Sequence, residues 1–192
     1  MSLLYRPVWY CQVMEITKRP SARQRILDTA AKLFYSRGIN NTGIDRIIAD
    51  AGVAKASMYN HFASKEEIVV TYLRGIREQF ALGLAKNSAV ASPSYDVPFR
   101  MLKMTLANGD FHGCPFSNAL VELPDSDSVK QEVSAYRNSV LEYFQLSVGG
   151  DSVKADKLMV VYDGAFLNCK LSPSESTVEG AIEIAGLIVG DC

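Results

Sequence analysis

The sequence predicts an all-α protein with a small N-terminal unit of three helices and a larger helical part after it. Apolar residues recur three and four positions apart along the chain, which is the spacing of one helical face, and strand-like alternation is missing. Residues that favour helix starts and glycines that favour helix ends divide the chain into nine or so helices. The chain has 192 residues, 48% of them hydrophobic and 21% charged, which is enough for a folded core.

Residues 21–38 carry the signals of a complete first helix. Ser21 followed by Gln24 is a capping box, and Gly38 is a natural stop. Between them one face is apolar: Ile26, Ala30, Leu33 and Phe34. A second helix is expected to start at Thr42, which has Asp45 three residues later, and to end at Gly52.

A short third helix, over residues 55–62, is expected only three residues after Gly52. Ser64 with Glu67 is another capping box, and it opens a long helix with an apolar face. Two short helices joined by a tight turn that contains glycine, with another helix before them, form a helix-turn-helix pattern.

Basic residues are concentrated in this part of the chain. Residues 18–65 have a net charge of +6, residues 66–192 have a net charge of −7, and the whole chain is only −1. A basic block joined to an acidic remainder indicates a polyanion-binding unit and a second unit with another task. We therefore expect an N-terminal extension or leader at residues 1–17, a helix-turn-helix domain at 18–66, and a helical domain at 67–192.

The stretch "VAKASMYNHFASKEEI", residues 53–68, fits the part of a helix-turn-helix that enters the major groove. Lys55 and Ser57 offer hydrogen-bond donors to bases or phosphates, and the small Ala56 lets the backbone come close. Met58 and Phe62 are four residues apart and are expected to point into the core.

Three further side chains near this helix are candidates for the DNA backbone. Tyr59 and His61 lie on other faces of the helix, and their polar tips can reach phosphates. A buried Tyr59 and a structural His61 are the alternatives. Lys65 lies in the first turn of the long helix, where free backbone N–H groups also favour a phosphate.

Residues 26–68 resemble the DNA-binding domain of the TetR family of bacterial transcriptional regulators. The resemblance rests on the ordered motifs A-x-x-L-F-x-x-x-G, "TGIDRIIADAGV" and "YNHFASKEE". It implies phosphate contacts or base contacts for Thr42, as the cap of the second helix, and for Lys55, Ala56, Ser57, Tyr59, His61 and Lys65. It also implies a homodimer that binds a palindromic double-stranded DNA operator and a small-molecule inducer that changes this binding.

The remaining helices are expected at 95–108, at 115–123, within 128–148, from Asp151 onward, and from Ser172 to the C-terminus. In the last of these, Ser172 is the expected cap and Pro173 the first helical residue. The final helix is apolar nearly all round, so it is expected to be buried by a partner or within the chain. The family resemblance implies that the last two helices form a four-helix bundle with a second copy.

The candidate inducer site lies among the central helices. Its expected lining is mostly aromatic: Met104, Phe111, Cys114, Phe116, Asn118, Tyr136, Phe144, Tyr162 and Phe166. The segment "FHGCPFSNALVEL" also resembles a G-C-x-[FL]-x-N stretch in one branch of TetR-type regulators. Cys114 is therefore either a small buried residue or a reactive thiolate at a helix N-terminus, and the latter makes an electrophile- or redox-sensing regulator the alternative function.

Other classes of protein are disfavoured. With two histidines, no Gly-rich phosphate loop and no metal-ligand spacing, we expect neither an enzyme nor a cofactor or metal site. No apolar run reaches the roughly 18 residues of a membrane span, and four scattered cysteines favour reduced thiols in the cytoplasm. An architectural DNA-binding protein would be basic throughout, unlike residues 66–192.

Overall fold

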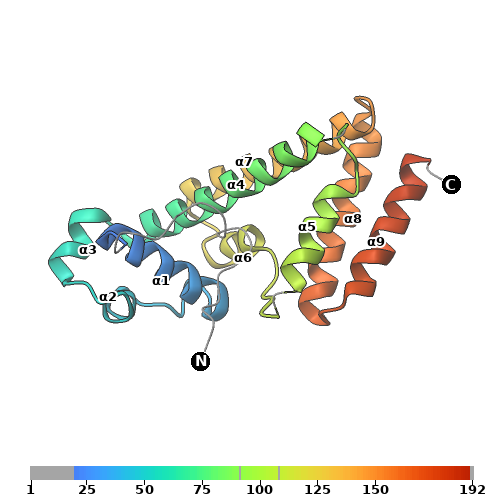
Figure 1. Ribbon diagram of the computed structural model, residues 1–192. Helices are drawn as coiled ribbons and strands as arrows, with labels where there is room; N and C mark the ends of the chain where they lie inside the picture. The colour runs from blue at the N-terminus through green and yellow to red at the C-terminus, as the bar shows by residue number, and fades with distance from the viewer. Residues whose placement is uncertain (1–19, 91, 108, 191–192) are drawn as a thin grey trace. The chain divides into compact units, whose positions relative to one another are not determined.

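The computed structural model describes residues 20–90, 92–107 and 109–190, so the expected extension at residues 1–17 lies outside the described residues. Over the described ranges the chain forms nine α-helices and no strand, as the sequence predicts (Figure 1). Two compact units can be distinguished, and each is described by itself: residues 20–76 with 115–133, and residues 77–114 with 134–190. The expected domain ranges stay a prediction, because these units group residues 115–133 with the N-terminal helices.

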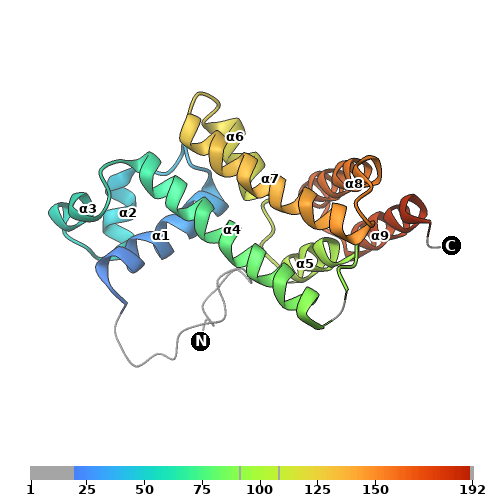
Figure 2. The same ribbon diagram turned by 90° about the horizontal axis from the view of Figure 1, so that it is seen from above.

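The first unit is built around α1 (Ala22–Arg37), α2 (Ile44–Ala51) and α3 (Lys55–His61), which pack against one another (Figure 2). We call residues 20–63 the head. The same unit contains the first part of α4 (Lys65–Val90), α6 (Pro115–Glu122) and the start of α7 (Asp127–Ser147). Its core includes the expected apolar faces: Ile26, Ala30, Phe34, Ile47, Met58, Phe62, Ile68 and Leu73.

Local hydrogen bonds explain why the helices of the head begin and end where they do. The Ser21 hydroxyl accepts from the Gln24 N–H over 3.1 Å, and Gly38 ends α1 with φ +88°. At α4, the Ser64 hydroxyl accepts from the Glu67 N–H over 3.1 Å, while the Glu67 carboxylate accepts from the Ala63 N–H over 2.7 Å. The serine caps predicted at Ser21 and Ser64 are confirmed. The return bond of Glu67 goes to the N–H of Ala63, one residue before the cap, and the Gln24 side-chain amide donates to Asp28 over 2.9 Å.

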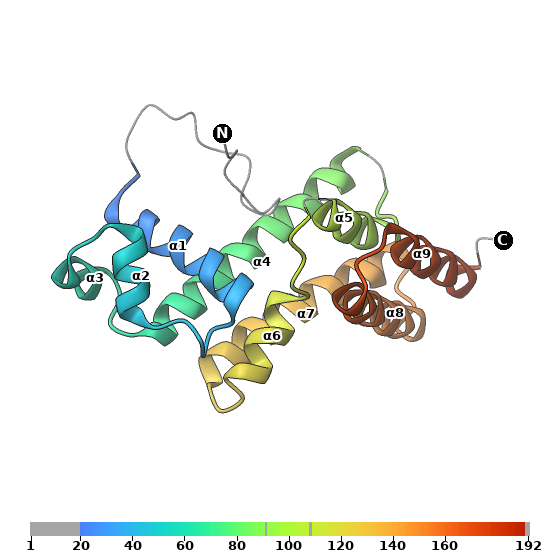
Figure 3. The same ribbon diagram turned by 90° about the horizontal axis from the view of Figure 1, so that it is seen from below.

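The second unit contains α5 (Val97–Leu106), α8 (Ser152–Leu171) and α9 (Glu175–Val189), together with the later parts of α4 and α7. α8 and α9 lie side by side and α5 packs on both of them (Figure 3). The Lys103 ammonium joins α5 to α9 through Glu175 over 3.2 Å and Glu179 over 2.7 Å. The predicted cap at Asp151 is confirmed, since its carboxylate accepts from the Lys154 N–H over 3.0 Å.

Two predicted helix starts are wrong. α2 has Gly43 as its N-cap and starts at Ile44, because the Thr42 hydroxyl donates instead to the Gly38 carbonyl over 2.7 Å. α9 starts at Glu175 with Ser174 as its N-cap, because α8 continues to Leu171 and Ser172 ends it by donating its N–H to the Asn168 carbonyl over 2.9 Å. Pro173 therefore lies between the two helices. The helix expected at 95–108 is shorter, at Val97–Leu106.

Candidate nucleic-acid interface

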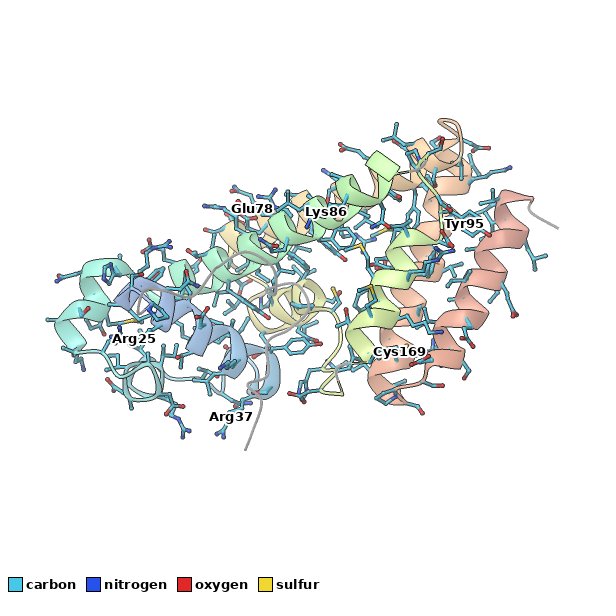
Figure 4. The ribbon with its side chains drawn as sticks, in the orientation of Figure 1. Arg25, Arg37, Glu78, Lys86, Tyr95 and Cys169 are labelled. Atoms are coloured by element: carbon cyan, nitrogen blue, oxygen red, sulfur yellow. The ribbon has the colours of Figure 1, made fainter. Side chains whose placement is uncertain are left out.

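The turn between α2 and α3 has the geometry of a helix-turn-helix. Gly52 ends α2 in the left-handed conformation with φ +61°, which a side chain would disfavour. The Arg25 guanidinium donates to the Ala51 carbonyl over 3.2 Å and to the Gly52 carbonyl over 3.4 Å (Figure 4 labels Arg25). Arg25 thus connects α1 to the C-terminal end of α2 through hydrogen bonds. The sequence pattern did not indicate this structural role.

α3 has one buried face and one solvent face. Met58 and Phe62 are each 1% exposed, as predicted. Tyr59 is 49% exposed, so the alternative of a core tyrosine is wrong. Lys55, Ala56 and His61 are exposed, and Ser57 is half-buried. The predicted base-reading and phosphate-contacting side chains of this helix therefore remain accessible, and their contacts with DNA stay a prediction.

The cations near α3 have different surroundings. The Lys55 ammonium forms a surface ion pair with Asp45 over 3.3 Å, which is a weak interaction that a phosphate can replace. Arg46 pairs with Asp50 over 2.6 Å. Arg23 is exposed, and its guanidinium lies 5.1 Å from the centroid of the Phe62 ring, which is a cation–π contact between α1 and the residue that ends α3.

Lys65 is half-buried in the first turn of α4. Burial lowers the pKa of its amine below the ordinary value, and the carboxylate of Glu122 acts in the opposite direction. A partly desolvated ammonium at a helix N-terminus is a favourable partner for a phosphate.

Thr42 differs from the other predicted site residues. Its side chain is 1% exposed, and its hydroxyl donates to the Gly38 carbonyl. Its backbone N–H donates to the Ile39 carbonyl over 3.1 Å. The predicted role as the cap of α2 is therefore wrong, and Thr42 instead fixes the turn between α1 and α2.

The predicted inducer-site residues are only partly brought together. Phe111, Tyr136, Phe144, Tyr162 and Phe166 belong to an aromatic cluster in the second unit, to which Phe80 and Phe99 also contribute. The ring centroids of Tyr162 lie 5.1 Å from Phe166, 5.4 Å from Phe99 and 5.9 Å from Phe144. Phe80 and Phe99 are not among the residues predicted for this site, and their ring contacts with Tyr136 and Tyr162 identify them.

Other predicted lining residues have different positions. Met104 is 57% exposed on α5, and Phe116 and Asn118 lie on α6 in the first unit. Within the cluster, the hydroxyls of Tyr136 and Tyr162 are 3.3 Å apart and buried. Burial raises the pKa of both phenols, so both stay neutral in the physiological range. The Cys114 thiol is half-buried and interacts electrostatically with both tyrosines.

Comparisons with known proteins identify the family. A family model described as "Bacterial regulatory proteins, tetR family" matches residues 26–71. The crystal structure of SCO4454, a TetR-family transcriptional regulator from Streptomyces coelicolor, is similar with a TM-score of 0.75 and 30% identity, covering 88% of this chain and 95% of that one. The chain belongs to the TetR family of transcriptional regulators, which are DNA-binding proteins and not enzymes.

Two curated relatives are named repressors. The HTH-type transcriptional repressor DhaR of Mycobacterium sp. (strain GP1) is 26% identical over 178 residues, which cover 84% of this chain and 88% of that protein. The HTH-type transcriptional repressor KstR2 of Mycobacterium tuberculosis is 46% identical over 55 residues, which are 29% of this chain and 28% of that protein. The match to KstR2 therefore spans little more than a quarter of its length.

Within residues 20–90, 92–107 and 109–190, no group of three or more histidine, cysteine, aspartate or glutamate side chains has the arrangement of a metal site. No described helix combines the length and the hydropathy that a membrane crossing requires.

Proposed function

We propose that this protein is a ligand-responsive repressor that binds a palindromic operator as a homodimer and releases it when a small molecule binds. The observation that carries the proposal is the division of α3 into a buried apolar face and an exposed polar face within a basic head. Such a helix can lie in the major groove without loss of its packing. The repressor names of the relatives support this direction of regulation.

In this proposal Lys55, Ala56 and Ser57 face the base edges, and Tyr59, His61 and Lys65 contact phosphates. Lys55, Ala56 and Ser57 form the N-terminal end of α3, and of these only Ser57 is half-buried. Tyr59 and His61 are exposed on the later part of α3, and Lys65 is half-buried in the first turn of α4. Thr42 is left out of the direct contacts, because its hydroxyl and its N–H both have partners inside the head.

Dimerisation is supported by an apolar stripe on α8. Val153, Val160, Leu167 and Leu171 are each more than half exposed, and they follow one another at intervals of seven, seven and four residues. This spacing places them along one face of the helix. Ile184 and Leu187 of α9 are also more than half exposed. Exposed apolar side chains aligned on one helix face favour a covering partner, and a second copy is the partner that fits a palindromic operator.

The proposed inducer is a small, partly aromatic molecule. It would bind at the aromatic cluster of the second unit, where rings offer stacking surfaces and the Tyr136 and Tyr162 hydroxyls offer polar contacts. Release of DNA requires that the molecule prefer the non-binding arrangement of the dimer by several kcal/mol.

The proposal is tested by selecting duplexes from a random-sequence pool with the purified full chain, with and without cell extract. Enrichment of an inverted repeat, and loss of that enrichment with extract, is the expected result. Recovery of unrelated duplexes with equal affinity would contradict an operator-specific regulator and favour a non-specific DNA-binding protein.

Electrophile or redox sensing through Cys114 is a second candidate function. The thiol is half-buried and immediately precedes α6, where helix N–H groups favour a thiolate. Cys169 is a matched control, because it is buried and desolvation raises the pKa of its thiol. Mild N-ethylmaleimide treatment followed by mass spectrometry should modify Cys114 but not Cys169 and should weaken DNA binding. An unmodified Cys114 in the folded protein, with unchanged DNA binding, would remove this candidate.

A further inference from the structure

Glu122, the last residue of α6, holds the turn between α1 and α2. The backbone N–H of Asn40 donates to Glu122 Oε2 over 2.7 Å, and the Asn40 side-chain amide donates to the Glu122 carbonyl over 3.0 Å. The two residues are 82 positions apart in the sequence and lie in the same compact unit. The contact therefore joins α6 directly to the head.

Gly38 lies on the other side of this carboxylate. A Cβ added at Gly38 would be 3.0 Å from Glu122 Oε2 and 3.2 Å from Oε1, so the carboxylate rests against the glycine backbone. The Gly38 carbonyl in turn accepts from the buried Thr42 hydroxyl over 2.7 Å. The turn that leads into α2 is thus fixed by Glu122 at its outer surface and by Thr42 at its inner surface.

We propose that Glu122 is a positioning residue for DNA binding, which orients α2, and with it the recognition helix α3, by fixing the α1–α2 turn. The proposal rests on the DNA-binding role proposed above. A helix-turn-helix binds specifically only when its two helices have the correct angle on the DNA, and α2 begins only two residues after Thr42. Neither Glu122 nor Asn40 needs to contact DNA for this effect.

The electrostatic surroundings fit this role. Glu122 is half-buried, and its carboxylate partly offsets the lowering of the Lys65 pKa by burial. It thus acts against the effect of burial on the Lys65 amine, at the position where a phosphate is expected. Repulsion between the Glu122 carboxylate and the DNA backbone acts in the opposite direction. Removal of the carboxylate should weaken DNA binding if its effect on the turn and on Lys65 dominates, and should strengthen DNA binding if repulsion dominates.

The test compares Glu122→Ala and Glu122→Gln in the full chain, with a fluorescent duplex selected from a random pool as the probe. Glu122→Ala should weaken binding about tenfold, because the Asn40 N–H loses a charged acceptor. Glu122→Gln keeps an oxygen acceptor, so its affinity should stay within about threefold of the original. Equal strengthening by both variants, or no change with Ala, would overturn the proposal.

Asp125→Ala is the matched control, because it removes an exposed carboxylate from the turn after α6. Its affinity should change less than about twofold, as expected of a screened surface charge. If Asp125→Ala changed the DNA affinity as much as Glu122→Ala, the effect would come from the loss of a negative charge and not from the loss of the contact with the α1–α2 turn.

A second measurement is independent of DNA. Hydrogen exchange of the Asn40 amide, followed by NMR, should be slow in the original chain and in Glu122→Gln and faster in Glu122→Ala, with shifted α2 resonances only in the Ala variant. Unchanged exchange and unchanged α2 resonances in Glu122→Ala would refute the positioning role. If the original chain binds no duplex, the proposed function fails, while this measurement still decides whether Glu122 fixes the turn.

Discussion

For Lys65, the sequence predicts the position in the helix, and the structure adds the surroundings of the side-chain amine. Ser64 caps α4 by accepting from the Glu67 N–H, and the Glu67 carboxylate accepts from the Ala63 N–H, so Lys65 lies in the first turn of the helix. The half-buried environment of the amine, and the influence of Glu122 on it, depend on a residue 57 positions away and could not be predicted from local pattern.

Lys65→Ala should weaken binding to all duplexes alike and reduce the steepness of the salt dependence. Loss of one phosphate contact removes about one unit from the slope of log Kd against log salt concentration. Fluorescence anisotropy over a series of KCl concentrations measures this slope. Lys86→Ala, which removes an exposed lysine near the far end of α4, is the control and should leave the slope unchanged. An unchanged slope for Lys65→Ala would exclude the phosphate contact.

Loss of the hydroxyl should affect stability differently at two buried tyrosines of α7. Among the described residues, the Tyr143 hydroxyl is buried without a hydrogen-bond partner, whereas Tyr136 is paired with Tyr162 over 3.3 Å. Tyr143→Phe should leave the free energy of unfolding unchanged or raise it by about 1 kcal/mol, and Tyr136→Phe should lower it by about 1 kcal/mol. Urea unfolding followed by circular dichroism measures both, and equal destabilisation would contradict this difference.

At the scale of helices, the start signals at Asp151 and Ser172 look equally strong in the sequence but behave differently. Asp151 caps α8, whereas Ser172 lies at the C-terminal end of the same helix. A capping residue in the sequence indicates where a helix can start, but it does not show where the preceding helix ends. Here α8 continues to Leu171, and Cys169 near its end is buried (Figure 4 labels Cys169).

This difference predicts the stability of two alanine variants. Asp151→Ala should lower the free energy of unfolding by about 1 kcal/mol, because the first turn of α8 loses its cap. Ser172→Ala should change it by less than about 0.5 kcal/mol, as expected of a surface position without a capping hydrogen bond. Chemical denaturation compares the two. A larger loss for Ser172→Ala would restore the predicted cap at the start of α9.

The apolar stripe of α8 predicts the effect of a charge at the proposed dimer interface. Val160→Glu and Leu167→Glu should each weaken self-association at least about 30-fold, because a carboxylate would be buried against a second copy. Leu82→Glu, at an exposed leucine of α4, is the control and should leave the mass in solution unchanged. Size-exclusion chromatography with light scattering measures the mass. Dimers that persist in both α8 variants would exclude this face from the interface.

For the whole molecule, the sequence was sufficient to predict the family and the all-α fold, because the helix-turn-helix motifs are local and ordered along the chain. The tie between Glu122 and Asn40 was not predictable, since hydrogen bonds between residues 82 positions apart leave no periodic pattern. The inducer site was predicted only in part for the same reason: Phe116 and Phe144 are both buried aromatic residues, but they belong to different compact units.

The number of protomers on one duplex is the most direct test of the proposed dimeric DNA-binding regulator. Sedimentation velocity of the full chain with a selected duplex, at low ionic strength, should show a complex of two protomers on one duplex, because paired heads about 34–36 Å apart meet successive major-groove faces. The free protein should sediment as a dimer under the same conditions. A monomeric protein that leaves the sedimentation of every duplex unchanged would contradict the proposal of a dimeric DNA-binding regulator.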